Sequence, residues 1–200
     1  MLTLYYAPQT RASRIVWMLE ELGQPFDLKL VDIRAGAQHQ AEYRRINPMG
    51  KVPALADGDR LVWESGAICT YLADRYPAAS LAPGINDARR GDYLKWMFFA
   101  SSDIEPAFAV KGATLALPSF SLGWGDEQRV LDAMVTCLTP GPFVLGERFS
   151  AADIIMGSIV QYGTMVKMMP EKPEFTRYMQ ALAARPAFQR AMAREAAMAG

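Results

Sequence analysis

The stretch that most constrains the fold of this chain runs from Asn47 to Leu55 and reads Asn-Pro-Met-Gly-Lys-Val-Pro-Ala-Leu. Gly50 predicts a turn, and the apolar strand that follows it is interrupted by Pro53. Because proline has no backbone N–H, it is out of place in a central strand. Pro53 therefore marks either a sheet edge or a point where the backbone turns outward and offers its polar groups to a ligand.

A second short strand and a helix start follow this stretch. Asp57-Gly58-Asp59 is a turn signal, and Leu61-Val62-Trp63 is the strand after it. Glu64 and Ser65 begin a helix whose first N–H groups and positive dipole end are directed beside the Pro53 strand. A helix start of this kind suits an anion, so we expect a carboxylate to bind there.

Together, the run from Asn47 to Leu55, the hairpin and the helix start Glu64-Ser65-Gly66-Ala67-Ile68 resemble the glutathione-binding half of a glutathione transferase. The alternative is an ordinary hairpin followed by a capped helix, which any α/β protein can contain. The resemblance implies an α/β thioredoxin-like N-terminal domain followed by an all-α C-terminal domain. It lies nearest to the serine-type theta-, delta- and nu-like classes and assigns no single class.

Composition sets broad limits on the class of protein. The 200 residues are 51% hydrophobic, enough for one large domain or two small ones with cores of their own. The 21 basic and 21 acidic residues give a net charge of +0, which does not suggest a nucleic-acid or membrane-surface partner. Neither a signal peptide nor a membrane span is recognisable, so a cytoplasmic protein is expected.

A metal site is not expected from the side chains available. Cys69 and Cys137 lie far apart, and His39 is the single histidine. This set lacks the spacing of a His/Cys metal cluster. Both cysteines stand in apolar helical surroundings, which favours buried structural thiols.

The N-terminal elements follow a thioredoxin-like order. A strand over 2–6 precedes a helix for which Thr10 is the predicted N-cap, and Gly23 ends that helix. An alternating strand over 26–30 comes next, and a β-α-β unit of this kind has parallel strands. We expect a glutathione-binding domain over 1–77, a linker over 78–86 and a helical domain over 87–200.

The second part of the chain is predicted to be helical. One helix is expected over 87–117 with a break at Pro106, and another over 126–138. Ser150 and Asp153 form a capping-box pattern, with Asp in place of Glu, before an apolar helix. This start also resembles the capped core helix of the transferase helical domain. Prolines 173 and 186 then stand near the starts of the last helices.

The resemblance implies which residues hold glutathione. Glu64 and Ser65 match the residues that bind its γ-glutamyl end, and the physics agrees, since a carboxylate suits the helix start and Glu64 can pair with the ammonium group. Val52, beside Pro53, matches the position that pairs with the cysteinyl backbone. Lys51 and Gln38, with His39 as the neighbour of Gln38, match positions near the glycyl carboxylate. The alternative roles are a first-turn acid for Glu64 and a solvated lysine for Lys51.

The reactive group is sought in the loop that reads Ala-Pro-Gln-Thr-Arg-Ala-Ser-Arg over 7–14. Thr10 matches the catalytic serine position of the serine-type classes, and its alternative role is a helix N-cap. A hydroxyl there can donate to the glutathione sulfur and stabilise the thiolate. Tyr5, Ser13 and the charge of Arg11 remain alternatives. The loop contains no cysteine, which argues against the omega and beta classes, and it lacks the zeta-class Ser-Ser-Cys pattern.

The second substrate implied by the resemblance is a small hydrophobic electrophile. Trp96, Phe99 and Asp103 stand at i, i+3 and i+7 and share one face of a predicted helix, which makes them candidates for its pocket. The alternative is a buried helix seam, in which Asp103 would be costly. Methionines 165, 168 and 169 can add a deformable wall.

The resulting functional hypothesis is a cytosolic homodimeric detoxification enzyme that conjugates the glutathione thiol to hydrophobic electrophiles. In the predicted two-fold dimer the helix over 65–76 of one subunit meets the helices that follow Asp87 of the other. Glutathione is the co-substrate, and no metal is required. The alternatives are a glutathione-dependent peroxidase or disulfide reductase, and a non-catalytic ligand-binding or protein-interaction module of the same fold.

Overall fold

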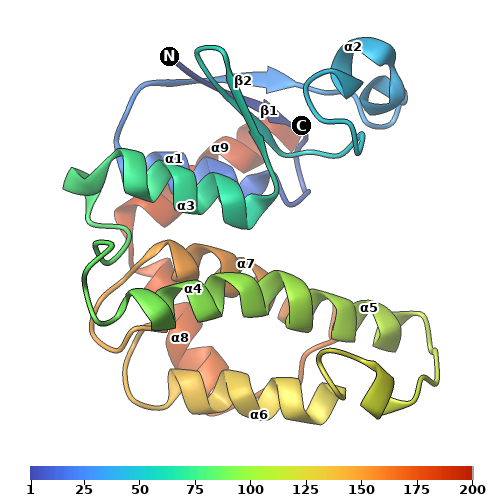
Figure 1. Ribbon diagram of the computed structural model, residues 1–200, viewed down its shortest axis with the longest axis vertical. Helices are drawn as coiled ribbons and strands as arrows, with labels where there is room; N and C mark the ends of the chain where they lie inside the picture. The colour runs from blue at the N-terminus through green and yellow to red at the C-terminus, as the bar shows by residue number, and fades with distance from the viewer. Residues whose placement is uncertain (200) are drawn as a thin grey trace. The chain divides into compact units, whose positions relative to one another are not determined.

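The computed structural model describes residues 1–199, which form two compact units. The first unit combines residues 1–80 with residues 185–199, and the second comprises residues 81–184 (Figure 1). The C-terminal residues therefore group with the N-terminal unit in the structure, although in sequence they follow the helical part.

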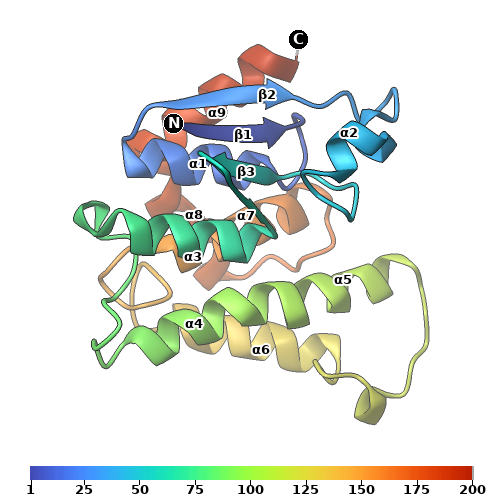
Figure 2. The ribbon, with the colours of Figure 1, turned by 45° about the horizontal axis from the view of Figure 1, so that its top comes forward.

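The first unit is built on a mixed four-stranded sheet in the order β2-β1-β3-β4 (Figure 2). Strands β1 and β2 are parallel, β3 runs antiparallel to β1, and β4 runs antiparallel to β3. The strands are β1 (Leu2–Tyr6), β2 (Phe26–Leu30), β3 (Ala54–Asp57) and β4 (Arg60–Trp63). This sheet and the helices between its strands confirm the predicted thioredoxin-like architecture.

The helices of the first unit occupy the connections between the strands and the end of the chain. They are α1 (Ser13–Leu22), η1 (Ala37–His39), α2 (Ala41–Arg44), α3 (Ser65–Arg75), η2 (Pro77–Ala79) and α9 (Pro186–Ala199). Gly23 ends α1 in a left-handed conformation with φ of 68°, and its N–H donates to the carbonyl of Leu19, as expected for a C-terminal glycine.

The prediction that Thr10 is the N-cap of α1 is wrong, because the residue before the helix is Ala12, which has no side-chain cap. The Thr10 hydroxyl instead accepts from the N–H of Ala12 at 3.1 Å in a local turn that precedes the helix. Thr10 therefore shapes the loop between β1 and α1 rather than the first turn of the helix.

Helix α9 lies alongside α1 in both views (Figures 1 and 2). The rings of Trp17 and Phe188 meet edge to face, with centroids 4.8 Å apart. Arg185 donates to both carboxylate oxygens of Glu21 at 2.7 Å. An edge-to-face aromatic pair and a two-pronged, largely buried ion pair are specific contacts, so α9 is an integral part of this unit.

The second unit is all-helical, as predicted. Its elements are α4 (Arg90–Phe99), the π-helical segment η3 (Ala100–Ile104), α5 (Glu105–Gly112), η4 (Ser119–Ser121), α6 (Glu127–Leu138), α7 (Ala151–Met165) and α8 (Pro173–Ala183). Helices α4 and α5 continue one another, and α6 runs beside α5 (Figure 2). The apolar helix α7 packs against α4 and α8 and forms the centre of this unit's core.

The break predicted at Pro106 takes the form of a π segment rather than a chain reversal. Pro106 has no N–H to donate to the carbonyl of Ser102, so the regular hydrogen-bond ladder is interrupted just before it. The helix widens over Ala100–Ile104 and resumes its α form at Glu105. A π turn holds more residues than an α turn, so Asp103 does not occupy the position that an unbroken helix would give it.

The capping box at the start of α7 is confirmed and extends into a buried network. The carboxylate of Asp153 accepts from the N–H of Ser150 at 2.8 Å, from the N–H of Val144 at 2.8 Å and from the hydroxyl of Tyr178 at 3.1 Å. These donors fasten the loop before α7 and helix α8 to the helix start. The network therefore serves the fold of the helical unit.

Candidate functional site

Two side chains fix the backbone before Pro53 by donating to the same carbonyl oxygen, that of Lys51. The hydroxyl of Tyr43 and the amide of Asn47 each donate to the carbonyl of Lys51 at 2.8 Å. Asn47 is almost fully buried, so its amide fixes the chain just before Val52. The Asn-Pro start of the motif marked this loop in the sequence, but nothing marked Tyr43 as its second anchor.

At Val52 and Pro53 the chain forms a cis peptide bond, and β3 begins only at Ala54. Within residues 1–199, no hydrogen bond uses the N–H or C=O of Val52. These groups remain available to pair with an extended peptide backbone, as the outward turn predicted at Pro53 requires. The side chain of Lys51 is exposed beside them.

Gly50 brings Gln38 against this stretch. Gly50 has a φ of +62°, and a Cβ added to it would stand 2.9 Å from the carbonyl oxygen of Gln38. The Gln38 amide donates to the carbonyl of Ile33 at 3.2 Å, whereas its Oε1 is buried and accepts no hydrogen bond among the described residues. His39 is exposed and lies within 3.2 Å of the Gln38 amide. The structure therefore places Gln38 next to the turn at Gly50, and its contact with the glycyl carboxylate stays a prediction.

The start of α3 supplies the anion-binding features expected from the sequence. Its first intrahelical hydrogen bond runs from the N–H of Ile68 to the carbonyl of Glu64 at 2.9 Å. The N–H groups of Ser65, Gly66 and Ala67 precede that bond, and within residues 1–199 no side-chain hydrogen bond caps this helix start. Glu64 is exposed and Ser65 is half-buried at the same helix start.

Glu64 holds a strained backbone at this helix start, with φ of 71° and ψ of 123°. A non-glycine residue in such a conformation costs on the order of 1–3 kcal/mol, and such residues cluster at ligand-binding sites. The strain is consistent with a site that orients both the Glu64 side chain and the first N–H groups of α3.

The loop after β1 carries the candidate reactive residues. The Thr10 hydroxyl donates to the carbonyl of Ala7 at 2.7 Å and accepts from the N–H of Ala12. Arg11 is exposed at the tip of the loop. Ser13 begins α1, and its hydroxyl is buried with no hydrogen-bond partner among the described residues. The structure thus leaves Thr10, Arg11 and Ser13 together near the positive end of α1.

Tyr5 is placed differently from the other candidates. It lies within β1, where its ring meets that of Tyr43 edge to face at 6.0 Å and the Lys29 ammonium lies 5.3 Å from its centroid. These contacts make Tyr5 part of the sheet surface. Burial raises the pKa of its neighbour Tyr43 to about 12, so that hydroxyl stays protonated at neutral pH.

The predicted electrophile residues lie in the second unit. The rings of Trp96 and Phe99 are in edge-to-face contact with centroids 5.4 Å apart. Asp103 is half-buried in the π segment and accepts from the hydroxyl of Ser102 at 2.6 Å. Trp96 and Phe99 thus pack together on α4, and the assignment of these residues to a substrate pocket stays a prediction. Of the methionines, Met165 is exposed and Met169 is buried.

The cysteines offer no reactive thiol at the surface. Cys69 and Cys137 are both buried and free, and burial raises the pKa of each thiol to about 12. Across residues 1–199, no three His, Cys, Asp or Glu side chains are grouped to hold a metal ion. In the same residues no helix is both long and apolar enough to cross a membrane.

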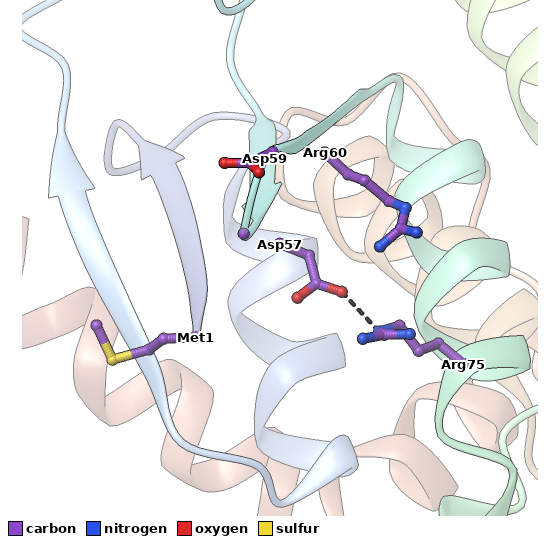
Figure 3. A pocket seen from close by; sticks show the side chains of 6 residues that line it. Met1, Asp57, Asp59, Arg60 and Arg75 are labelled. Carbon is purple, nitrogen blue, oxygen red and sulfur yellow. Dashed lines mark ion pairs between the residues drawn. The ribbon is translucent and has the colours of Figure 1, made fainter.

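A separate hollow of about 490 Å³ opens at the turn between β3 and β4 (Figure 3). Its lining includes Met1, Asp59 and Arg60, together with Asp57 and Arg75, which form an ion pair at 2.6 Å. This hollow lies at the other end of β3 from Pro53. It belongs to the hairpin turn and contains none of the predicted glutathione-binding residues.

Comparison with known proteins identifies the family and the fold that this chain resembles. Residues 1–74 match the family model described as glutathione S-transferase, N-terminal domain. A crystal structure of a glutathione transferase from Methylococcus capsulatus is 30% identical, with a TM-score of 0.83 over 98% of this chain and 100% of that one.

Two further proteins bear on the chemistry of the site. A glutathione transferase homologue from Sulfitobacter, solved with bound glutathione, is 27% identical, with a TM-score of 0.77 over 97% of this chain and 98% of that one. The disulfide-bond oxidoreductase YfcG of Escherichia coli is 29% identical over 77% of this chain and 76% of its own length.

Proposed function

This chain belongs to the glutathione S-transferase family, and we propose that it is an enzyme that conjugates the thiol of glutathione to small hydrophobic electrophiles. Two features carry the proposal: the start of α3, where Glu64 has a strained backbone, and the backbone of Val52. Among the described residues, no side chain caps the first and no hydrogen bond uses the second. One offers donors to a carboxylate, and the other offers a strand edge to a peptide.

In the proposed complex, the γ-glutamyl carboxylate accepts from the Ser65 hydroxyl and the first N–H groups of α3. Glu64 pairs with the ammonium group, since opposite charges there form a charge-assisted hydrogen bond. The cysteinyl backbone pairs with the N–H and C=O of Val52 beside Pro53.

The glycyl end of glutathione then lies beside the Lys51 turn. The Lys51 ammonium neutralises its carboxylate, and Gln38 stands next to that turn across Gly50.

The thiol is activated by the loop between β1 and α1. A free thiol of this type has a pKa of about 8.5, so the protein must favour the thiolate at neutral pH. We assign that role to the hydroxyl of Thr10, which lies near the positive end of α1. The Arg11 guanidinium is the electrostatic alternative. On the electrophile side, Trp96, Phe99 and Asp103 are the proposed pocket residues.

A second candidate function is the reduction of disulfides with glutathione, favoured by the similarity to the Escherichia coli oxidoreductase. Two glutathione thiols would each lose a proton and an electron, giving glutathione disulfide and two product thiols. Because both cysteines of the chain are buried with raised pKa values, the electrons would come from glutathione rather than from the protein.

Retention on immobilised glutathione, followed by assays with a chloronitroarene and with a small disulfide, tests these proposals. Conjugation supports the first and disulfide reduction the second. Binding without turnover of either substrate would overturn both in favour of a non-catalytic module. A Ser65→Ala variant that binds and reacts like the wild type would show that the site is wrongly placed.

We also propose that the protein acts in the cytoplasm as a two-fold homodimer. Closed two-fold symmetry is the commonest arrangement of soluble oligomers. One chain has a mass of 22.1 kDa, so a sedimentation mass near that value at micromolar concentration would contradict the dimer.

A further inference from the structure

Helix α9 reaches the loop that carries Thr10 through a single side chain, Glu195. The Tyr6 hydroxyl, at the end of β1, donates to Glu195 Oε1. The backbone N–H of Gln9 donates to Glu195 Oε2 at 3.1 Å. One carboxylate from the far end of the sequence therefore joins the last residue of the strand to the loop that follows it.

The residue that Glu195 holds has an unfavourable backbone conformation. Gln9 has a φ of 57°, in the left-handed region that non-glycine residues rarely adopt. Such a conformation persists only where its surroundings fix it. The hydrogen bond from the Gln9 N–H is the contact that ties this residue to a rigid element.

The placement of Gln9 sets the placement of the residue after it. Thr10 follows directly, and its hydroxyl bridges the carbonyl of Ala7 and the N–H of Ala12 across the same turn. A shift of Gln9 would therefore change the direction of the Thr10 hydroxyl and of the N–H groups that follow.

The contacts that hold α9 on α1 do not involve the loop between β1 and α1. Five residues before Glu195 on α9, Arg190 donates to Glu20 Oε2 at 2.7 Å, and Arg194, directly before Glu195, pairs with the same carboxylate. These contacts dock α9 on α1 and do not touch residues 7–12. Removing one of them is therefore a matched control for the effect of weaker packing between α9 and α1.

We propose that Glu195 is a positioning residue that holds the Gln9 N–H and thereby fixes the loop that presents Thr10 to the glutathione sulfur. The inference rests on the proposed function for its consequence in catalysis. The contact itself is testable without turnover. It gives the C-terminal helix a part in the site that the sequence did not indicate.

The test compares four variants of the full chain: Glu195→Ala, Glu195→Asp, Glu195→Gln and Arg190→Ala. Alanine removes the carboxylate that accepts from the Gln9 N–H, and aspartate draws it back by one methylene. The aspartate variant replaces the alanine variant in the test if the latter fails to fold. Glutamine keeps an oxygen of the same reach for the Gln9 N–H but loses the charge. Arg190→Ala weakens docking of α9 without touching the loop.

Two readouts separate positioning from general stability. Amide hydrogen exchange at Gln9, followed by NMR, should accelerate roughly tenfold or more in Glu195→Ala and Glu195→Asp, and stay within about threefold of wild type in the other two variants. In the conjugation assay, kcat of Glu195→Ala and Glu195→Asp should fall roughly tenfold or more. Their KM for glutathione should change little, because the γ-glutamyl end is bound at α3.

Unchanged Gln9 exchange in Glu195→Ala would overturn the inference. So would an equal loss of kcat in Arg190→Ala, or a glutamine variant as impaired as the alanine variant. If the wild-type protein neither binds glutathione nor turns it over, the proposed function fails. The exchange measurement still decides in that case whether Glu195 holds the loop.

Discussion

The hydroxyl of Thr10 donates its only proton to the carbonyl oxygen of Ala7, at 2.7 Å. To donate to a glutathione sulfur, this hydroxyl must rotate and release Ala7, while its oxygen can keep accepting from the N–H of Ala12. Thiolate stabilisation by Thr10 therefore exchanges one hydrogen bond for a charge-assisted one, which is the stronger of the two.

Replacing Thr10 with valine should raise the pKa of the bound thiol by roughly one to two units, since one unit equals about 1.36 kcal/mol. The pH–rate profile of conjugation should shift upward accordingly, while glutathione affinity stays within a few-fold. Thr10→Ser is the matched control and should keep the profile. If Thr10→Val leaves the profile in place and Arg11→Ala moves it, the guanidinium rather than the hydroxyl stabilises the thiolate.

Ser65→Ala should weaken glutathione binding by about 1–3 kcal/mol, because it removes a hydrogen bond to a charged carboxylate. Calorimetry measures the dissociation constant directly. Ser119→Ala, at an exposed position in the helical unit, should leave the constant unchanged. Equal affinities for the Ser65→Ala and wild-type proteins would place the γ-glutamyl site elsewhere.

Gly50→Ala and Gly58→Ala form a matched pair. Both glycines have positive φ, 62° and 59°, so alanine should lower the free energy of unfolding at either position by straining the left-handed backbone. Only at Gly50 would the new Cβ collide with the carbonyl of Gln38, at 2.9 Å. Urea unfolding should therefore show a loss of stability about 1–3 kcal/mol larger for Gly50→Ala. Glutathione affinity should fall in that variant alone, and equal effects of the two changes would contradict the contact with Gln38.

The buried carboxyl of Asp153 should make stability depend on pH. Burial raises its pKa from the ordinary value of 3.8 to about 7. Because the folded state holds this proton more tightly than the unfolded state does, unfolding releases it between those values, and this contribution to stability is lost as pH rises through about 7.

In an Asp153→Asn variant that contribution is absent. The free energy of unfolding of the wild type, measured relative to this variant by urea denaturation, should fall between about pH 4 and pH 7 and then level off. A difference that stays constant or rises with pH would show that the hydrogen bonds from Val144, Ser150 and Tyr178 hold the folded carboxyl ionised.

The sequence predicts those parts of the fold that depend on local signals. Gly23 ends α1, the Gly58 turn separates β3 from β4, and Ser150 and Asp153 begin α7, each because a few neighbouring residues decide the backbone. The start of α3 and the Pro53 stretch were recognisable for the same reason, and they make up most of the candidate site.

Contacts between distant segments left no such signal. The helix over 186–199 has an amphipathic pattern that does not name its partner. Contacts with residues far away in sequence join it to α1: Arg185 with Glu21, Phe188 with Trp17, and Arg190 with Glu20. In the sequence, nothing distinguishes Glu195 from the other charged residues of an alanine-rich helix. The sequence does not show that Thr10 lies before the helix rather than at its N-cap, because a threonine hydroxyl can serve a preceding turn as well as a helix start.

The proposed enzyme must bind glutathione and lower the pKa of its thiol. Ultraviolet absorption of the thiolate, recorded as the pH of the saturated protein is raised, measures the pKa of the bound thiol most directly. We predict a value at least one unit below the roughly 8.5 of a free thiol, moving upward in Thr10→Val. A bound thiol that ionises at or above the free value would mean that the protein does not activate glutathione.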